Sequence, residues 1–207
     1  MSTLLHQAKP DLPHALRERL PQAQAHAERA AGEINDAMAP HMPEFKRRFA
    51  VMQGGTESKT HRLIKIRALA DDMGEIVASQ AACRQGCSHC CHIPVALLQV
   101  EADLIGRAIG VTPKRVKKSV SPEARGFGYH MPCPFLKDNA CSIYAHRPFS
   151  CRVHFNLDAD ALLCALLPGQ TVPVPLANMV PLQTAYITTL RKEHLGDIRD
   201  FFPNGAR

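Results

Sequence analysis

Apolar residues recur at helical spacing along much of this chain. The clearest stripe runs from residue 60 to about Cys83, and a second fills residues 92–110. Side chains three and four positions apart share one face of an α-helix, so each stripe predicts a helix with one buried face. Ser58 or Thr60 is placed to cap the first helix, and Gly110 to end the second. The middle of the chain therefore predicts two core helices.

The N-terminal quarter has a different pattern. Residues 13–38 are rich in Ala, Glu, Arg and Gln, which are strong helix formers, and they predict one or two surface helices. Residues 39–57 contain two prolines and a Gly-Gly pair, which are typical of a loop. We therefore expect residues 1–57 to form a helical extension and linker, and residues 58–207 to form the domain that holds every cysteine.

Beyond residue 110 the apolar pattern is weaker. Short helices are expected after Pro113 and within residues 157–167, and a last helix within residues 182–195. Nothing in the pattern of residues 201–207 holds them, so we expect this tail to fray. The predicted fold class is mostly α: an irregular cysteine-rich domain with an N-terminal helical extension.

Charge and hydropathy argue against two classes of partner. The 25 Lys and Arg residues against 19 Asp and Glu give a net charge of +6, but the basic runs are short and no aromatic residues interleave them. Solvated helix faces explain such runs, so the sequence does not favour nucleic acid. Nowhere do 18 apolar residues run together, and the start lacks the features of a secretory leader. We expect a cytoplasmic protein without a membrane partner.

All eight cysteines fall after residue 82. Four lie in the stretch CRQGCSHCC at residues 83–91, and three more in CPFLKDNACSIYAHRPFSC at residues 133–151. In a reducing compartment, clustered thiols are more often metal ligands or redox groups than disulfides. Cysteines two residues apart can present both sulfurs to one metal ion from a tight turn. Two such groups favour a metal centre.

Seven sulfurs are more than one ion needs. A tetrahedral zinc takes four ligands, and a four-iron cluster also takes four thiolates. Cys90 and Cys91 are adjacent, and neighbouring side chains in extended backbone point to opposite sides. Either one of the two binds elsewhere or the site holds more than one metal atom. The surplus suggests a redox role, a second metal, or packing for some of the cysteines.

The ordered motifs CRQGCSHCC, EADLI, CPFL, ACSIYAHRP and CRVH resemble the YkgJ-type cysteine-cluster family, whose domain is described as zinc- or iron-chelating. The resemblance covers a motif core at residues 83–155, about a third of the chain. It implies metal binding, with an iron-sulfur cluster as first choice and zinc as second. The implied metal ligands are Cys83, Cys87, Cys90, Cys91, Cys133, Cys141 and Cys151.

The resemblance also implies residues that support the metal ligands. These are Tyr144, Arg147 and Arg152, and Glu101 takes the place of a glutamate that the family carries on a helix. Cys164 matches no family position, so we interpret it as a small buried hydrophobic residue.

Three functional hypotheses remain open. The first is a metal-binding protein whose iron-sulfur cluster or zinc is structural or redox-active, with an unknown substrate. The second is an enzyme that uses the centre, such as an iron-sulfur-dependent methyltransferase or an oxidoreductase; a related module occurs in flagellin lysine methylases, but a glycine-rich nucleotide fingerprint is absent from this sequence. The third is a metal-handling or partner-binding module whose N-terminal helices dock an unknown protein.

Overall fold

The structure is a computed structural model that describes residues 12–54, 56–168 and 170–205. The first eleven residues of the predicted extension, Gly55 of the Gly-Gly pair and the last two residues of the tail lie outside this description. The α-helices are α1 (His14–Met38), α2 (Met42–Gly54), α3 (Lys59–Ala78), α4 (Gln99–Ile109), α5 (Phe149–Arg152), α6 (Val180–Thr189) and α7 (Ile198–Phe201). The strands are β1 (Ala96–Leu98), β2 (Leu136–Lys137), β3 (Ala140–Cys141) and β4 (Leu195–Asp197). The prediction of a mostly α fold is confirmed.

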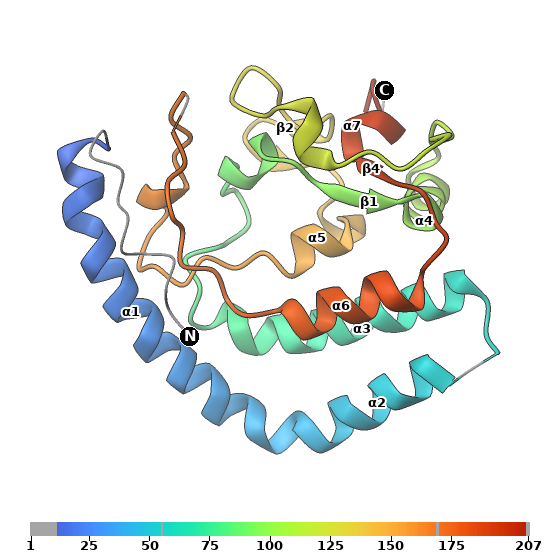
Figure 1. Cartoon of the computed structure of the whole chain (residues 1–207), viewed down its shortest axis with the longest axis horizontal. Helices are drawn as coiled ribbons and strands as arrows, with labels where there is room; N and C mark the ends of the chain where they lie inside the picture. The colour runs from blue at the N-terminus through green and yellow to red at the C-terminus, as the bar shows by residue number, and fades with distance from the viewer. Residues whose placement is uncertain (1–11, 55, 169, 206–207) are drawn as a thin grey trace.

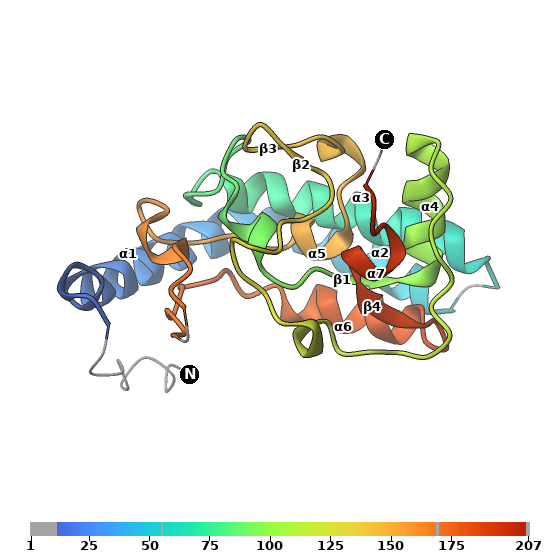
Figure 2. The ribbon, with the colours of Figure 1, turned by 90° about the horizontal axis from the view of Figure 1, so that it is seen from above.

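The elements form three tiers. Helices α1 and α2 form an arc along one side, and α3 and α6 lie next to each other across the middle (Figure 1). The cysteine-bearing loops, the short strands and α4 cover the side of α3 that faces away from α2. Seen from above, α1 extends past the rest of the molecule at one end (Figure 2). Helix α3 contacts α1, α2, α4, α5 and α6, so it is the central element.

Helix α1 forms because its apolar positions repeat every three or four residues. Its buried side chains are Leu16, Leu20, Ala23, Ala27, Ala30, Ile34 and Met38. The helix continues through Pro21, so the expected one or two helices are a single one. The first half of this face packs on Leu163, and the second half joins the main core with α3.

The loop predicted for residues 39–57 is wrong. A short 3-10 turn, Ala39–His41, leads directly into α2, which buries Phe45 and Met52 in the main core. Both prolines of the segment fall in the first positions of these two elements. A helix start tolerates proline because the missing N–H has no intrahelical partner there. The division at residue 57 into an extension and a cysteine domain stays a prediction.

Helix α3 begins where expected and ends early. The Ser58 hydroxyl accepts a hydrogen bond from the His61 N–H at 3.3 Å and caps the start, as predicted. The helix ends at Ala78, so Cys83 lies in the following loop and not on the last helical turn. The backbone there pairs across the molecule, because the Ala82 N–H donates to the Asn156 carbonyl at 2.9 Å.

The second core helix, α4, ends at Gly110 with φ of 71°, as predicted, but the prediction of a helix from residue 92 is wrong, because α4 begins only at Gln99. Strand β1 precedes it and pairs antiparallel with β4, with Leu97 opposite Gly196. The expectation that the tail frays is wrong for the described residues, because Phe201 and Phe202 are 1% and 2% exposed in a second apolar cluster. Their isolated position in the sequence gives no periodicity to detect.

Two short helices predicted after residue 110 do not form. The Lys114 N–H donates to the Phe201 carbonyl at 2.9 Å, and the Val116 N–H donates to the Gln99 side chain at 3.1 Å. Residues 157–167 contain only the 3-10 turn Leu162–Cys164. In both segments N–H groups bond to partners outside a local helix, which competes with the helical pattern. The last predicted helix is present as α6.

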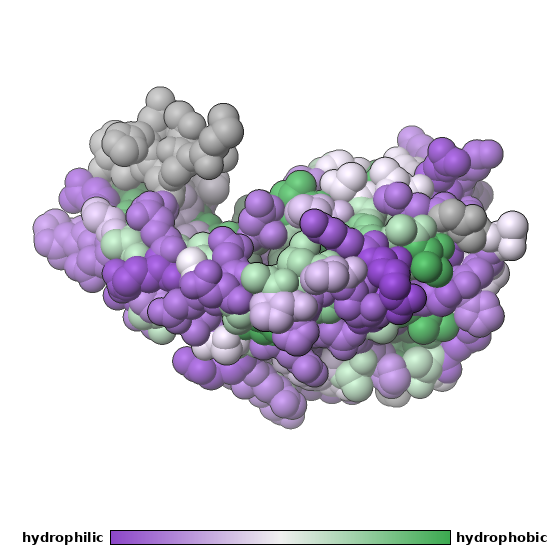
Figure 3. Space-filling model, turned by 90° about the horizontal axis from the view of Figure 1, so that it is seen from below, coloured by the Kyte–Doolittle hydropathy of each residue, from purple (hydrophilic) through white to green (hydrophobic). Residues whose placement is uncertain are grey.

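The surface seen from below is largely hydrophilic, with small separate apolar areas (Figure 3). Across the described ranges, no helix combines the length and apolarity needed to cross a membrane.

Candidate metal centre

The seven predicted cysteine ligands line one cavity of about 540 Å³. They come from segments that are far apart in the sequence: the loop after α3, the turn before β2, strand β3 and helix α5. Helix α3 forms one wall, where Gly74 allows the ring of Phe155 to pack closely. The fold thus brings together the residues that the two sequence motifs contain.

The first motif is a pair of tight turns. Gly86 has φ of 95°, and the Cys87 N–H donates to the Arg84 carbonyl at 3.0 Å. Cys90 and Cys91 lie in the 3-10 turn His89–His92 rather than in extended backbone. In this turn the Cys91 thiol donates a hydrogen bond to the Cys90 sulfur, so the two neighbouring side chains are in contact.

The second motif presents Cys133 and Cys141 from a small hairpin. Strands β2 and β3 pair so that Leu136 lies opposite Cys141. The two residues between the strands, Asp138 and Asn139, have φ of 48° and 59°, as a type I′ turn requires. The Cys133 N–H donates to the Cys91 carbonyl at 2.6 Å, so the hairpin is joined to the first motif.

A buried glutamate fixes the helix that carries Cys151. Glu101 on α4 is fully buried; one of its carboxyl oxygens accepts from the Phe149 N–H at 2.8 Å, and the other from the Tyr186 hydroxyl at 2.7 Å. The rings of Phe149 and Tyr186 stack at 4.4 Å. Burial raises the pKa of Glu101, against the opposing effects of the Tyr186 hydrogen bond and of the Arg67 charge. Glu101 therefore positions α5 and does not line the cavity.

Arg152 and Arg147 have different places in the site. Arg152 donates to the Arg147 carbonyl at 2.9 Å and the Ala145 carbonyl at 2.7 Å, and it pairs with Asp71 on α3 at 2.5 Å. It therefore ties the loop before α5 to α3. The Arg147 guanidinium lies 4.0 Å above the ring of Tyr144 and lines the cavity. Their role as supports of a bound metal stays a prediction.

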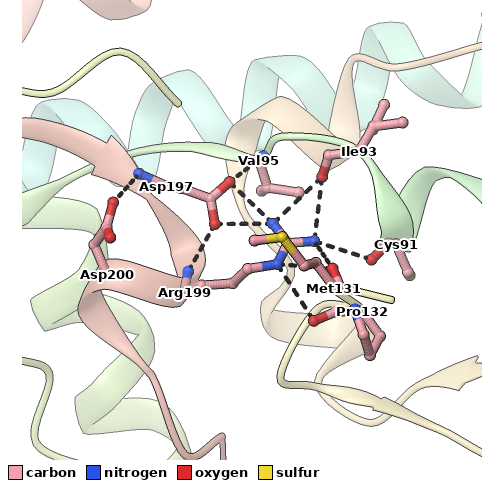
Figure 4. Close-up of polar contacts among 8 residues, drawn as sticks. All are labelled: Cys91, Ile93, Val95, Met131, Pro132, Asp197, Arg199 and Asp200. Atoms are coloured by element: carbon pink, nitrogen blue, oxygen red, sulfur yellow. Dashed lines mark hydrogen bonds and ion pairs between the residues drawn. The ribbon is translucent and has the colours of Figure 1, made fainter. Parts of the chain in front are cut away.

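Sequence reasoning missed Arg199, which joins the two cysteine motifs (Figure 4). Its guanidinium donates to the Met131 carbonyl at 2.8 Å and the Cys91 carbonyl at 3.3 Å, with further bonds to the Ile93 and Pro132 carbonyls. Asp197 pairs with it at 2.8 Å, and the same carboxylate accepts from the Val95 N–H. An arginine far along the chain with no motif around it gives no sequence signal for this role.

Burial sets the protonation of most of the thiols. It raises the pKa of Cys133 to about 11 and also raises the pKa of Cys83, Cys141 and Cys151. Cys90 is the exception, because a hydrogen bond from the Cys91 thiol lowers the pKa of Cys90 to about 7. A metal ion binds the thiolate form, so its binding to these residues releases protons.

Cys164 is not the plain buried hydrophobe that the sequence suggested. It is partly exposed, and its sulfur accepts a hydrogen bond from the side-chain amide of Asn156 at 3.4 Å. The Asn156 backbone N–H donates to the Cys83 sulfur at 3.2 Å. Cys164 lines a second cavity of about 260 Å³, which Cys83, Cys87 and Cys90 also line. The missed signal is an eighth cysteine in a protein that otherwise confines cysteine to its metal motifs.

The residues around the larger cavity fit a thiolate-bound metal in their chemistry. Among the described residues, no three His, Cys, Asp or Glu side chains already converge as a finished metal site, so binding has to draw the sulfurs together. The cavity holds many times the volume of one water, about 30 Å³, and therefore has room for more than a single ion. Within the described chain, Arg147 Nε is buried and has no hydrogen-bond partner, which suits an anionic thiolate centre.

Comparison with known protein families agrees with this reading of the residues. Residues 82–165 match the CxxCxxCC family model. The family is described as "Putative zinc- or iron-chelating domain", and the match covers about two fifths of the chain. No curated protein and no solved structure matches the chain. The CxxCxxCC match supports metal binding by this segment and includes Cys164, whereas the YkgJ-type name stays a prediction.

Proposed function

We propose that this chain is a metal-binding protein whose cysteine site holds an iron-sulfur cluster, with zinc as the second choice, in a structural or redox role. The observation that carries the proposal is that all seven cysteines of the two motifs, although up to 68 positions apart (151 − 83), line one cavity. Sulfur ligands select zinc, copper(I) and iron-sulfur clusters over hard cations. Seven thiols on one cavity exceed the four that either a tetrahedral ion or a four-iron cluster takes, so the first choice of a cluster rests on the family resemblance, and the surplus suggests a redox role or a second metal.

The test is elemental analysis with a visible absorption spectrum on protein purified without oxygen. Iron with acid-labile sulfide and broad absorption in the blue supports the iron-sulfur proposal. Colourless protein with stoichiometric zinc supports a structural zinc site instead. Protein purified under both iron and zinc supplementation with neither metal bound contradicts both forms.

Variants in one hairpin give a matched control. Cys141→Ser removes a predicted ligand with little change in size, and it should lower the metal content. Ser142→Ala alters the next residue, whose hydroxyl donates to the Phe135 carbonyl at 2.9 Å, and it should keep the metal content of the wild type. Equal metal content in the two variants contradicts the role of Cys141.

A second candidate function is an enzyme that uses the centre, such as a methyltransferase or an oxidoreductase. A third cavity of about 260 Å³ lies against Cys90 and Cys151 and is lined by Phe149, Tyr186 and Ile187. An apolar cavity beside a reactive centre is a common form of substrate site. Calorimetric titration of the metal-loaded protein with S-adenosylmethionine tests methyl transfer, and absence of binding removes that form of the hypothesis.

Location and protein partner are two further proposals. We propose a cytoplasmic location, because all eight cysteines are free thiols in the structure and thiols persist in reducing compartments.

A protein partner on α1 and α2 is also a proposal, and a deletion is a poor test because both helices bury side chains in the main core. Charge reversal of exposed residues on α1, followed by co-purification, tests the partner surface without opening the core.

A further inference from the structure

The eight cysteines divide into three sets by the cavities that they line. One set lines the larger cavity and is absent from the described lining of the smaller one: Cys91, Cys133, Cys141 and Cys151. A second set lines both cavities: Cys83, Cys87 and Cys90. Cys164 lines the smaller cavity and is absent from the described lining of the larger one. Four sulfurs thus belong to the larger cavity alone, and four face the smaller one.

Packing agrees with this division for five of the eight cysteines. Cys133 belongs to the apolar cluster formed by β1, α4 and α7, and Cys91, Cys141 and Cys151 pack against that cluster. Cys83 packs instead against the main helical core. The adjacent residues Cys90 and Cys91 lie at the division between the groups, because Cys90 lines both cavities and Cys91 is in the described lining of the larger one alone.

Asn156 holds Cys83 and Cys164 on one side of this division. It is 1% exposed, and it donates its backbone N–H to the Cys83 sulfur and its side-chain amide to the Cys164 sulfur. The orientation of the amide is fixed, because its oxygen accepts from the Asp158 N–H at 2.9 Å and its nitrogen donates to the Asp160 carbonyl at 2.9 Å. Amide donors to sulfur are typical of metal-bound thiolates, where they offset the negative charge.

We propose that the site is two metal centres that share a wall. One is held by Cys91, Cys133, Cys141 and Cys151, and the other by Cys83, Cys87, Cys90 and Cys164. Each group has the four sulfurs that one tetrahedral zinc or one four-iron cluster takes. The division explains why two adjacent cysteines occur in the first motif and why seven sulfurs are too many for a single centre. The inference rests on the proposed function and adds Cys164 to it.

The experiment counts cobalt(II) ions on the metal-free, reduced full-length chain by native mass spectrometry, with the cobalt-thiolate absorption recorded in parallel. The wild type should bind two ions. Cys164→Ser and Cys141→Ser should each bind one, with about half of the absorption, and the double variant should bind none. Both serine variants replace partly exposed side chains with others of similar size, and circular dichroism checks that α1–α3 remain folded in each.

The outcomes separate the two levels of the proposal. A wild type that binds one ion, or a folded Cys164→Ser variant that still binds as many ions as the wild type, overturns the two-centre inference and leaves the proposed function standing. A wild type that binds neither cobalt nor zinc nor iron overturns both. If Cys164→Ser fails to fold, Cys164→Ala takes its place, and a folded alanine variant that binds as many ions as the wild type overturns the inference.

Discussion

The helical region and the cysteine region of this molecule are ordered by different interactions. In α1, α2 and α3 the buried residues are apolar and repeat at helical spacing, so burial of one face of each helix accounts for their order. In the cysteine region, residues 83–155, each described element except α4 is two to four residues long, and buried charged groups fix the region: Glu101 holds α5, and Arg199 holds both motifs. We therefore expect a bound metal to contribute little to the stability of the helical region and much to the stability of the cysteine region.

Removal of the metal should have the largest effect, and it should affect the two regions differently. Structural zinc contributes on the order of 10 kcal/mol to small cysteine domains, so a chelator under reducing conditions should loosen residues 83–155. Helices α1 to α3 should keep their protection against exchange, because Cys83 is the one predicted ligand that packs on their core among the described residues. Hydrogen exchange with mass spectrometry checks this region by region. Unchanged exchange across residues 83–155 after verified metal loss would contradict the comparison.

The next largest effect is expected from Arg199→Leu. The change leaves Asp197 buried without its cation and removes the donors to carbonyls of both motifs. Removal of one partner of a buried ion pair lowers the free energy of unfolding by about 3–5 kcal/mol. Urea unfolding of the metal-loaded protein measures the loss. Arg115→Leu is the matched control, because its pair with Asp103 is exposed and should contribute about 1 kcal/mol or less.

Leu69→Ala tests the helical side of the comparison. Leu69 on α3 is fully buried in the main core, and large-to-small changes at such positions cost about 2–5 kcal/mol. Metal content should remain close to that of the wild type, since Leu69 is not in the described lining of the cysteine cavity. Ile64→Ala, on the same helix but 46% exposed, should cost much less. Equal losses in urea unfolding for the two variants count against the assigned core.

The smallest effect concerns the pH dependence of stability. Burial raises the pKa of Glu101, so between its unfolded pKa of about 4.3 and its folded pKa the folded protein binds the extra proton. The free energy of unfolding should therefore fall as pH rises through this window. Glu101→Gln removes the titrating group, so its stability should fall less steeply than that of the wild type. Urea unfolding at a series of pH values compares the two slopes, and identical slopes contradict the assignment.

The sequence predicted those features whose cause is local. The stripe on α3, its Ser58 cap and the end of α4 at Gly110 each depend on residues a few positions apart. The seven cysteines of the two motifs line one cavity, and their role as metal ligands stays a prediction. Arg199 and Asn156 act across more than 70 positions on groups that carry no complementary pattern, so nothing local marks them. Pro43 was misjudged because proline ends a helix in one position and starts it in another.

The position of Arg199 along the chain has a consequence for biosynthesis. A nascent chain emerges from the ribosome with its N-terminus first, so α1 to α3 can pack while the cysteine loops are still being synthesised. All the cysteines emerge before the arginine that fixes the carbonyls of Cys91 and Met131. A nascent chain therefore exposes flexible thiols until residue 199 has left the ribosome. Metal delivered during that interval meets cysteine loops that lack the Arg199 hydrogen bonds. Metal delivered later meets loops that Arg199 already holds in place.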